Sequence, residues 1–190
     1  IVSDIYLNST FPQTEIDKER GVIIEEINMY EDMPNHMVQN IFTRLMYNGQ
    51  SAGRDVIGTA KSVGKMNHDD FVNYHKKFYT PGNTVIVVSG SFDQTIMLSA
   101  VKKQFACLNK VPVPKTIKTK DAQKQPQVNV VYKQTDQSHM VLGWHGVPIG
   151  HSDQQIYTVL ASLLGGGMSS RLFTKLREDM GVCYYVNAGN

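Results

Sequence analysis

The chain has 190 residues, of which 41% are hydrophobic and 19% are charged, a composition typical of a folded globular protein rather than a disordered chain. Its 19 basic and 17 acidic side chains leave a net charge of +2, which is too near neutral to indicate binding to nucleic acid or to a membrane surface. No apolar run approaches the roughly 18 residues that would predict a membrane span.

The first half of the chain carries the hydrophobic spacing of helices. One apolar stripe runs along residues 17–32, whereas residues 1–16 are expected to be irregular because polar residues and Pro12 interrupt any period. Asn67 is a good N-cap and is followed by acids, which suit the first turn of a helix. The helices expected here are residues 17–32, residues 35–47, a short segment capped by Thr59 or Ser62, a helix after Asn67, and a helix from Asp93 to about Phe105.

Several segments rich in valine and aromatic residues predict β-strands. They are residues 84–88, 128–132, 139–145 and 182–186. Two further helices are expected between the last two of these segments, one capped by Ser152 and one capped by Ser169 or Ser170 and ending near Met180. Lysines and prolines gather in residues 109–127, which predicts a solvated linker. The expected fold class is therefore α+β, with antiparallel sheets flanked by helices on one face.

Two acidic residues are candidates for chemistry. Glu19 and Glu26 lie seven residues apart, so a helix would project both carboxylates from one face. The spacing alone favours a solvated acidic face. A metal-ligand carboxylate with an acidic neighbour is the functional alternative, although a catalytic zinc ion needs three protein ligands and an open position for water.

A second pair, Arg177 and Tyr184, lies on either side of Gly181 near the end of the chain. In isolation the two residues are a surface arginine and a half-buried tyrosine. Alternatively, a guanidinium and a phenol aimed into one cavity would stabilise an oxyanion or hold a peptide carbonyl. The six histidines show no HxxH, HExxH or HxxEH spacing, so we expect no ligand role for them. The glycines 165–167 predict a flexible connection rather than an anion site.

Several motifs in a fixed order resemble the pitrilysin/insulinase family of zinc metallopeptidases. Residues 19–27, ERGVIIEEI, are similar to the helix that carries the third zinc ligand in that family. Residues 164–173, LGGGMSSRLF, are similar to the bacterial, mitochondrial-processing-peptidase-like branch. The remaining similar segments are YTPGN at 79–83, VSG at 88–90, LRE at 176–178 and GVCY at 181–184.

The resemblance implies a role for each candidate residue. Glu26 would be the third zinc ligand, Glu19 a supporting acid, and Arg177 with Tyr184 the pair that binds the peptide or its oxyanion. It also implies two consecutive related peptidase-like units, both incomplete: the end of one in residues 1–108 and the beginning of another in 128–190, with residues 109–127 as the linker. The substrate would be a peptide or an unfolded polypeptide.

The family's hallmark HxxEH motif is absent from these 190 residues. We therefore expect the histidine ligands and the catalytic base to lie upstream of Ile1, and this chain to be an internal fragment of a zinc peptidase that is inactive alone. Unpaired strand edges would favour self-association or pairing with a second peptidase-like half. Cys107 and Cys183 cannot form a disulfide framework, which favours a reducing compartment and hence the cytoplasm.

Two alternatives remain open from the residues. The chain could come from a non-catalytic relative that serves as a scaffold or a peptide-binding subunit, although retention of all four candidate residues argues against loss of function. It could also be a plain α+β domain that binds peptides. Finding HxxEH in the parent sequence would separate the peptidase from the scaffold.

Overall fold

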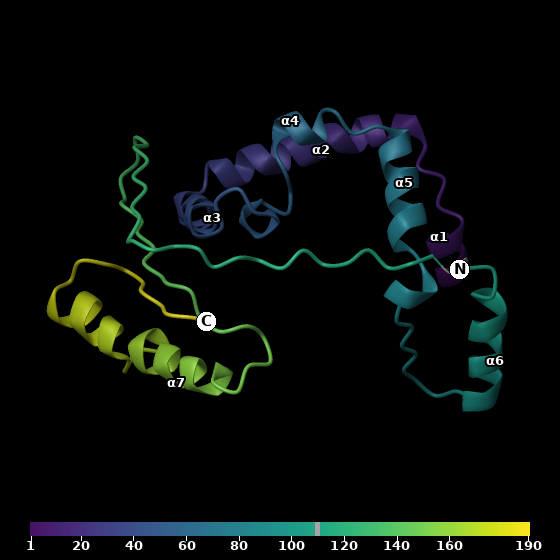
Figure 1. Ribbon diagram of the computed structural model, residues 1–190. Helices are drawn as coiled ribbons and strands as arrows, with labels where there is room; N and C mark the ends of the chain where they lie inside the picture. Colours follow the sequence, from purple (N-terminus) through teal and green to yellow (C-terminus); the bar gives the residue numbers. More distant parts are fainter. Residues whose placement is uncertain (109–110) are drawn as a thin grey trace. The chain divides into compact units, whose positions relative to one another are not determined.

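Every regular element in the described part of the chain is a helix (Figure 1). The computed structural model describes residues 1–108 and 111–190, and it divides them into two compact units, Ile1–Val141 and Leu142–Asn190. None of the helices in the described residues is long and apolar enough to cross a membrane.

The first unit is built around one long helix. Its helices are α1 (Val2–Leu7), α2 (Gln13–Glu31), α3 (Pro34–Met46), η1 (Ser51–Gly53), α4 (Ala60–Val63), α5 (His68–Phe78), η2 (Pro81–Asn83) and α6 (Gln94–Gln104). Helix α2 packs against α3 and α4. The buried apolar side chains are Ile16 and Ile27 of α2 and Val63 of α4, so the core of the unit lies along one face of α2.

The start of the chain differs from the sequence-based expectation. Residues 1–16 were expected to be irregular, but α1 occupies Val2–Leu7 and α2 begins at Gln13 rather than at Asp17. Pro12 lies at the N-cap of α2 and its carbonyl oxygen accepts hydrogen bonds from Glu15 and Ile16. Proline is compatible with the first turn of a helix, so Pro12 starts α2 instead of interrupting it.

Aromatic contacts hold α1 against α5. The ring of Tyr6 lies 4.8 Å from that of Tyr79 and 5.8 Å from that of Phe105, measured between centroids. His75 Nε2 lies 2.7 Å from the carbonyl oxygen of Tyr6, and the Tyr6 hydroxyl pairs with the hydroxyl of Thr84. A histidine for which the sequence suggested no role is therefore part of the packing between these two helices.

The second unit contains α7 (Gln154–Gly165) and the π-helix η3 (Phe173–Asp179). The N-cap of α7 is Asp153 rather than the expected Ser152. A Cβ atom added to Gly165 would lie 2.3 Å from the backbone nitrogen of Ala188, so only glycine lets residues 187–188 approach the end of α7 this closely. Ser170 is buried, and its hydroxyl has no hydrogen-bond partner within the described residues, so it does not supply the expected side-chain cap.

The α+β fold class predicted from the sequence is wrong. Residues 84–88, 128–132, 139–145 and 182–186 contain no β-strand, and no sheet forms anywhere in residues 1–108 or 111–190. A strand exists only where its backbone N–H and C=O groups pair with a neighbour. The valine and aromatic content of these segments indicates that they would fit a β-sheet, but it does not show that a neighbouring strand is present.

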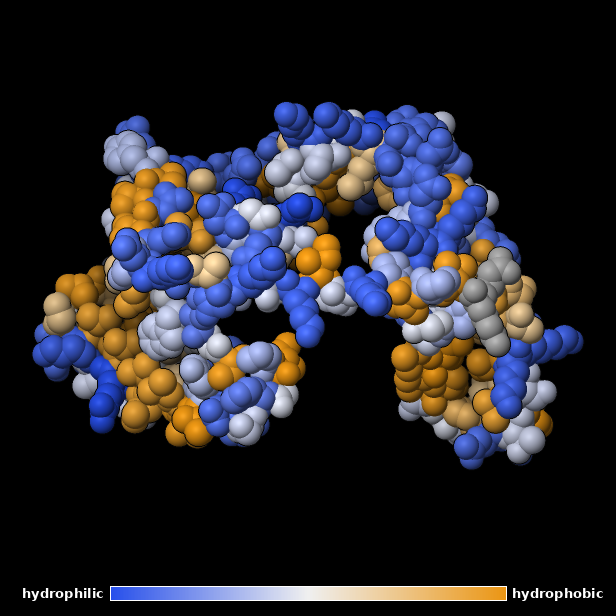
Figure 2. Space-filling model, viewed as in Figure 1, coloured by the Kyte–Doolittle hydropathy of each residue, from blue (hydrophilic) through white to orange (hydrophobic). Residues whose placement is uncertain are grey.

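Apolar side chains of both units are in contact with solvent. Val85 and Val87 are 88% and 83% exposed in the first unit, and Ile156 and Val159 of α7 are 65% and 68% exposed in the second. Figure 2 shows hydrophobic residues at the surface of the molecule. Both units therefore carry hydrophobic surface that the described residues do not cover.

The predicted linker begins at residues 109 and 110, which lie outside the described residues. Residues 111–127 contain no helix or strand. The side chain of Gln50 holds this segment at one point, because its amide donates to the Lys120 carbonyl at 3.0 Å and accepts from the Lys120 N–H at 2.6 Å.

Candidate functional site

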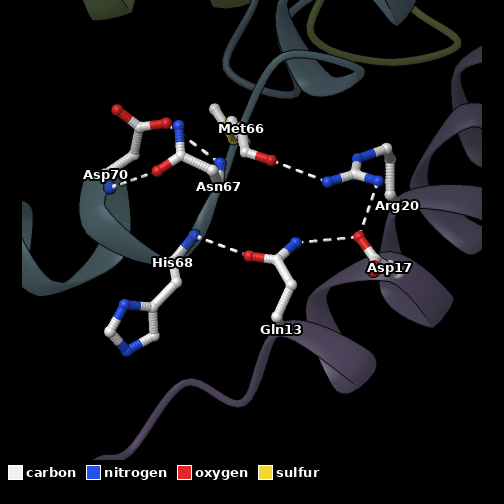
Figure 3. Close-up of polar contacts among 7 residues, drawn as sticks. All are labelled: Gln13, Asp17, Arg20, Met66, Asn67, His68 and Asp70. Carbon is white, nitrogen blue, oxygen red and sulfur yellow. Dashed lines mark hydrogen bonds and ion pairs between the residues drawn. The ribbon is translucent and has the colours of Figure 1, made fainter.

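Helix α2 carries both acidic candidates, and a polar network fastens its first turns to the beginning of α5 (Figure 3). The Gln13 side chain accepts a hydrogen bond from the backbone N–H of His68 at 3.0 Å and donates one to Asp17 Oδ1 at 2.8 Å. Gln13 thus links a residue of α2 to the first residue of α5. The position of α2 in the unit is set partly by this link.

Arg20 makes a second link on the same side of α2. One of its nitrogens, Nη1, donates to Asp17 Oδ1 at 2.8 Å, and Nη2 donates to the carbonyl oxygen of Met66 at 2.7 Å. The hydrogen bond from Gln13, together with the charge and hydrogen bond of Arg20, lowers the pKa of Asp17 below its ordinary value of 3.8. Arg20, the neighbour of Glu19 in the sequence, therefore helps to position helix α2.

Glu19 and Glu26 lie on the helix that this network holds. Glu19 is exposed, whereas Glu26 is half-buried beside the buried Ile27. Two helical turns separate them, about 10.5 Å along the axis. Within the described residues neither carboxylate has a hydrogen-bond or ion-pair partner, although Glu15, Asp17 and other acids of this unit do have one.

Whether this chain can hold a metal ion depends on how many ligand side chains the structure brings together. In the part of the chain that the structure describes, no three His, Cys, Asp or Glu side chains group closely enough to hold a metal ion. A catalytic zinc ion requires three such ligands. Glu26 offers one carboxylate, so the described residues do not by themselves form a zinc centre.

Arg177 and Tyr184 both belong to the second unit. Arg177 is exposed on η3, and Tyr184 is 86% exposed on the segment that follows. Between them Gly181 adopts a φ of +63°, in the left-handed region that favours glycine, and the N–H of Val182 donates to the carbonyl of Leu176 at 3.0 Å. The turn at Gly181 thus closes the end of η3 before the segment of Tyr184, and both side chains remain accessible.

Sequence reasoning missed the residue that contacts Arg177. The guanidinium carbon Cζ of Arg177 lies over the ring of Phe173, at 5.5 Å from the centroid. A separation of four residues on a helix is the signal that could have found this pair. Glu19 and Glu26 belong to the first unit, and Arg177 and Tyr184 belong to the second.

Comparison with protein families gives a match along nearly the whole chain. Residues 1–60 match the family described as insulinase, peptidase family M16, and residues 65–190 match the family described as peptidase M16 inactive domain. The chain belongs to the M16 peptidases, the insulinase family. This confirms the resemblance that the ordered motifs indicated.

Curated bacterial relatives agree with this assignment. The uncharacterized zinc protease YmxG of Bacillus subtilis is 33% identical over 186 residues, which are 98% of this chain and 45% of that protein. The uncharacterized zinc protease SCO5738 of Streptomyces coelicolor is 31% identical over 200 residues, covering 98% of this chain and 42% of that protein. The chain thus spans less than half the length of these relatives.

Solved structures share the fold. The peptidase M16 inactive domain of Pseudomonas fluorescens superimposes with a TM-score of 0.79 at 19% identity, over 98% of this chain and 45% of that one. A protease of Helicobacter pylori gives a TM-score of 0.74 at 22% identity, over 94% of this chain and 45% of that one. At these identities the similarity shows a shared fold and does not show a shared activity.

Proposed function

We propose that the chain is part of a zinc-dependent metalloendopeptidase that hydrolyses peptides, and that it is inactive alone. In this proposal Glu26 supplies one ligand for the zinc ion, Glu19 is a supporting acid, and Arg177 with Tyr184 binds the peptide. The observation that carries the proposal is that Glu26 is half-buried on an anchored helix and has no partner within the described residues. A carboxylate in that position is available to a cation.

The peptide-binding part of the proposal rests on accessible donors. The guanidinium of Arg177 carries five N–H donors and no acceptor, and the hydroxyl of Tyr184 can donate one hydrogen bond. Both side chains are exposed in one unit, on either side of the Gly181 turn. Together they can hold the carbonyl oxygens of a peptide backbone, or an oxygen on which negative charge develops.

The zinc part is tested in the parent protein that contains this chain. Glu26→Gln removes the charge and keeps the shape of the side chain, so we expect loss of bound zinc and of peptide hydrolysis. Glu25→Gln is the matched control, because Glu25 is an exposed acid next to Glu26 on the same helix. Zinc content is measured by metal analysis and hydrolysis with a fluorogenic peptide. A Glu26→Gln protein that keeps both properties would contradict the ligand role.

A second candidate function is a non-catalytic peptidase-like subunit that binds peptides or acts as a scaffold. It is favoured by the match of residues 65–190 to a family described as inactive. The two candidates differ in the parent protein: the scaffold binds peptide without hydrolysing it, and its peptide affinity is unchanged by Glu26→Gln.

We also propose a domain arrangement, a partner and a compartment. Residues 1–108 would end one peptidase-like unit and residues 128–190 would begin the next, joined by the linker. The partner would be a second copy or a second peptidase-like half, which the exposed apolar residues of both units support.

Cys107 and Cys183 are both free thiols, which suits the cytoplasm, and cell fractionation tests this location.

A further inference from the structure

The π-helix η3 presents Arg177 in an arrangement that ordinary surface packing does not require. The N–H of Met180 donates to the carbonyl of Lys175, five residues earlier, at 3.1 Å. Such π-turns are rare and occur frequently at functional sites. In this case the turn carries the arginine that the proposed function assigns to peptide binding.

The neighbours of Arg177 leave its charge available. Asp179, two residues further along η3, is paired instead with Lys175 Nζ at 3.2 Å. Within residues 1–108 and 111–190 no carboxylate lies within ion-pair distance of Arg177, and its recorded contact is with the ring of Phe173. The guanidinium is therefore held by an aromatic ring and not by an acid.

This difference matters for binding. A carboxylate partner would accept hydrogen bonds from the N–H donors of the guanidinium, whereas an aromatic ring has no carboxylate oxygen to occupy them. The distance of 5.5 Å from Cζ to the ring centroid is within the range of a cation–π contact. Phe173 is half-buried and Arg177 is exposed, so the ring is fixed by its surroundings while the guanidinium meets solvent.

We propose that Phe173 is a positioning residue for peptide binding: its ring restrains the guanidinium of Arg177 in an orientation whose free N–H donors meet the carbonyl oxygens of a peptide backbone. The inference rests on the proposed function of Arg177. It adds to that function the residue that orders the arginine.

The first test observes Arg177 directly in the full 190-residue chain. Ring currents of Phe173 shift the NMR signals of the Arg177 side chain, which are identified by their loss in Arg177→Lys. We expect Phe173→Leu to abolish this shift and Phe173→Tyr to keep it. A shift that is absent from the unchanged chain, or that survives in Phe173→Leu, would overturn the restraint.

The second test measures binding of a decapeptide of alanine, glycine and leucine that has acetylated and amidated ends and a neutral coumarin label. Fluorescence anisotropy gives the affinity of the same chain for this probe, which offers backbone carbonyls and no carboxylate. Arg177→Ala should weaken binding by at least about tenfold, since hydrogen bonds to a charged group are lost. Phe173→Leu should weaken binding about two- to fivefold, as expected for an exposed cation–π contact. Phe173→Tyr keeps an aromatic ring and should bind as the unaltered chain does.

Asp179→Asn is the matched control, because it removes the ion pair of the same helix and leaves the ring and Arg177 unchanged; it should bind as the unaltered chain does. If Arg177→Ala weakens binding and Phe173→Leu does not, the positioning role fails and the proposed role of Arg177 stands. If Arg177→Ala binds normally, the role of Arg177 fails and the positioning role fails with it. Should Phe173→Leu not fold, pentafluorophenylalanine at position 173 keeps the size of the ring but reverses its quadrupole, and must weaken binding to the same extent.

Discussion

At the scale of single residues, the chain separates acids that hold the fold from acids that remain available. Asp17 receives hydrogen bonds from both Gln13 and Arg20, and these contacts join α2 to the start of α5. Glu19 and Glu26 on the same helix have no such partner within the described residues. Sequence spacing identified the second group. It did not reveal that Asp17 belongs to a structural network, because its neighbours on α2, Gln13 and Arg20, also bond to His68 and Met66 far along the chain.

This separation predicts how stability depends on pH at Asp17. Its pKa is lowered in the folded state, so the carboxylate stabilises the fold above the pKa of the unfolded chain, and this contribution is lost as the pH falls through the folded pKa. We expect Asp17→Asn to reduce the difference in free energy of unfolding between pH 7 and pH 3. Urea titrations at the two pH values measure this difference.

Glu15→Gln is the control for that experiment, because the ion pair of Glu15 with Lys18 is open to solvent on both sides. It should leave the difference between the two pH values nearly unchanged. A larger effect from Glu15→Gln than from Asp17→Asn would contradict the structural role of the network.

At the scale of elements, the caps expected at Thr59, Asn67 and Asp93 were confirmed, whereas those at Ser152 and Ser170 were wrong. Asn67 was expected to cap a helix, and its side chain accepts hydrogen bonds from the N–H groups of Asp69 and Asp70 at 2.9 and 3.3 Å. Asp70 in turn accepts from the N–H of Asn67 at 2.9 Å, which completes a capping box. Caps can be read from sequence because donor and acceptor lie within three residues of each other.

The cap of α5 gives a prediction of stability. Asn67→Ala should lower the free energy of unfolding by about 1 kcal/mol, since it leaves the first N–H groups of the helix without a side-chain acceptor. Asn67→Asp keeps an acceptor and should cost much less. Chemical denaturation followed by circular dichroism compares the two variants. Equal losses from both would show that the cap contributes nothing.

At the scale of the whole molecule, neither unit covers its apolar surface with described residues. The segments predicted as strands form no sheet in the described residues, and Val85 and Val87 are among their exposed side chains. Exposed apolar segments with free backbone groups favour association. These segments carry the sequence pattern of strands. The expected sheet is nevertheless missing, because no neighbouring strand pairs with them in the described residues.

Association is therefore expected in solution. Sedimentation velocity over a range of concentrations should show oligomers of the 190-residue chain. Changing Val85 and Val87 together to threonine should shift the distribution toward monomer, because it reduces the apolar area while keeping the β-branched shape. Val56→Thr is the control, since Val56 is fully exposed but has a polar neighbour, Asp55. A monomer at all concentrations would refute this prediction.

Metal binding is also a property of the whole molecule. Because Glu26 is a single ligand, the chain purified alone should not retain stoichiometric zinc and should not cleave peptides. Metal analysis after dialysis, beside a fluorogenic peptide assay, measures both properties. One tightly bound zinc ion per chain would show that ligands within these 190 residues were overlooked.

The sequence alone determined the family, most helices and the candidate residues, since ordered motifs, helix caps and apolar stripes are local properties of the chain. It did not determine the pairing of strands, because a ladder depends on a partner that a pattern cannot supply. Only the tertiary structure revealed that Gln13 and Arg20 hold α2 by bonding to His68 and Met66. Such contacts depend on which parts of the folded chain meet, and composition and spacing do not carry that information.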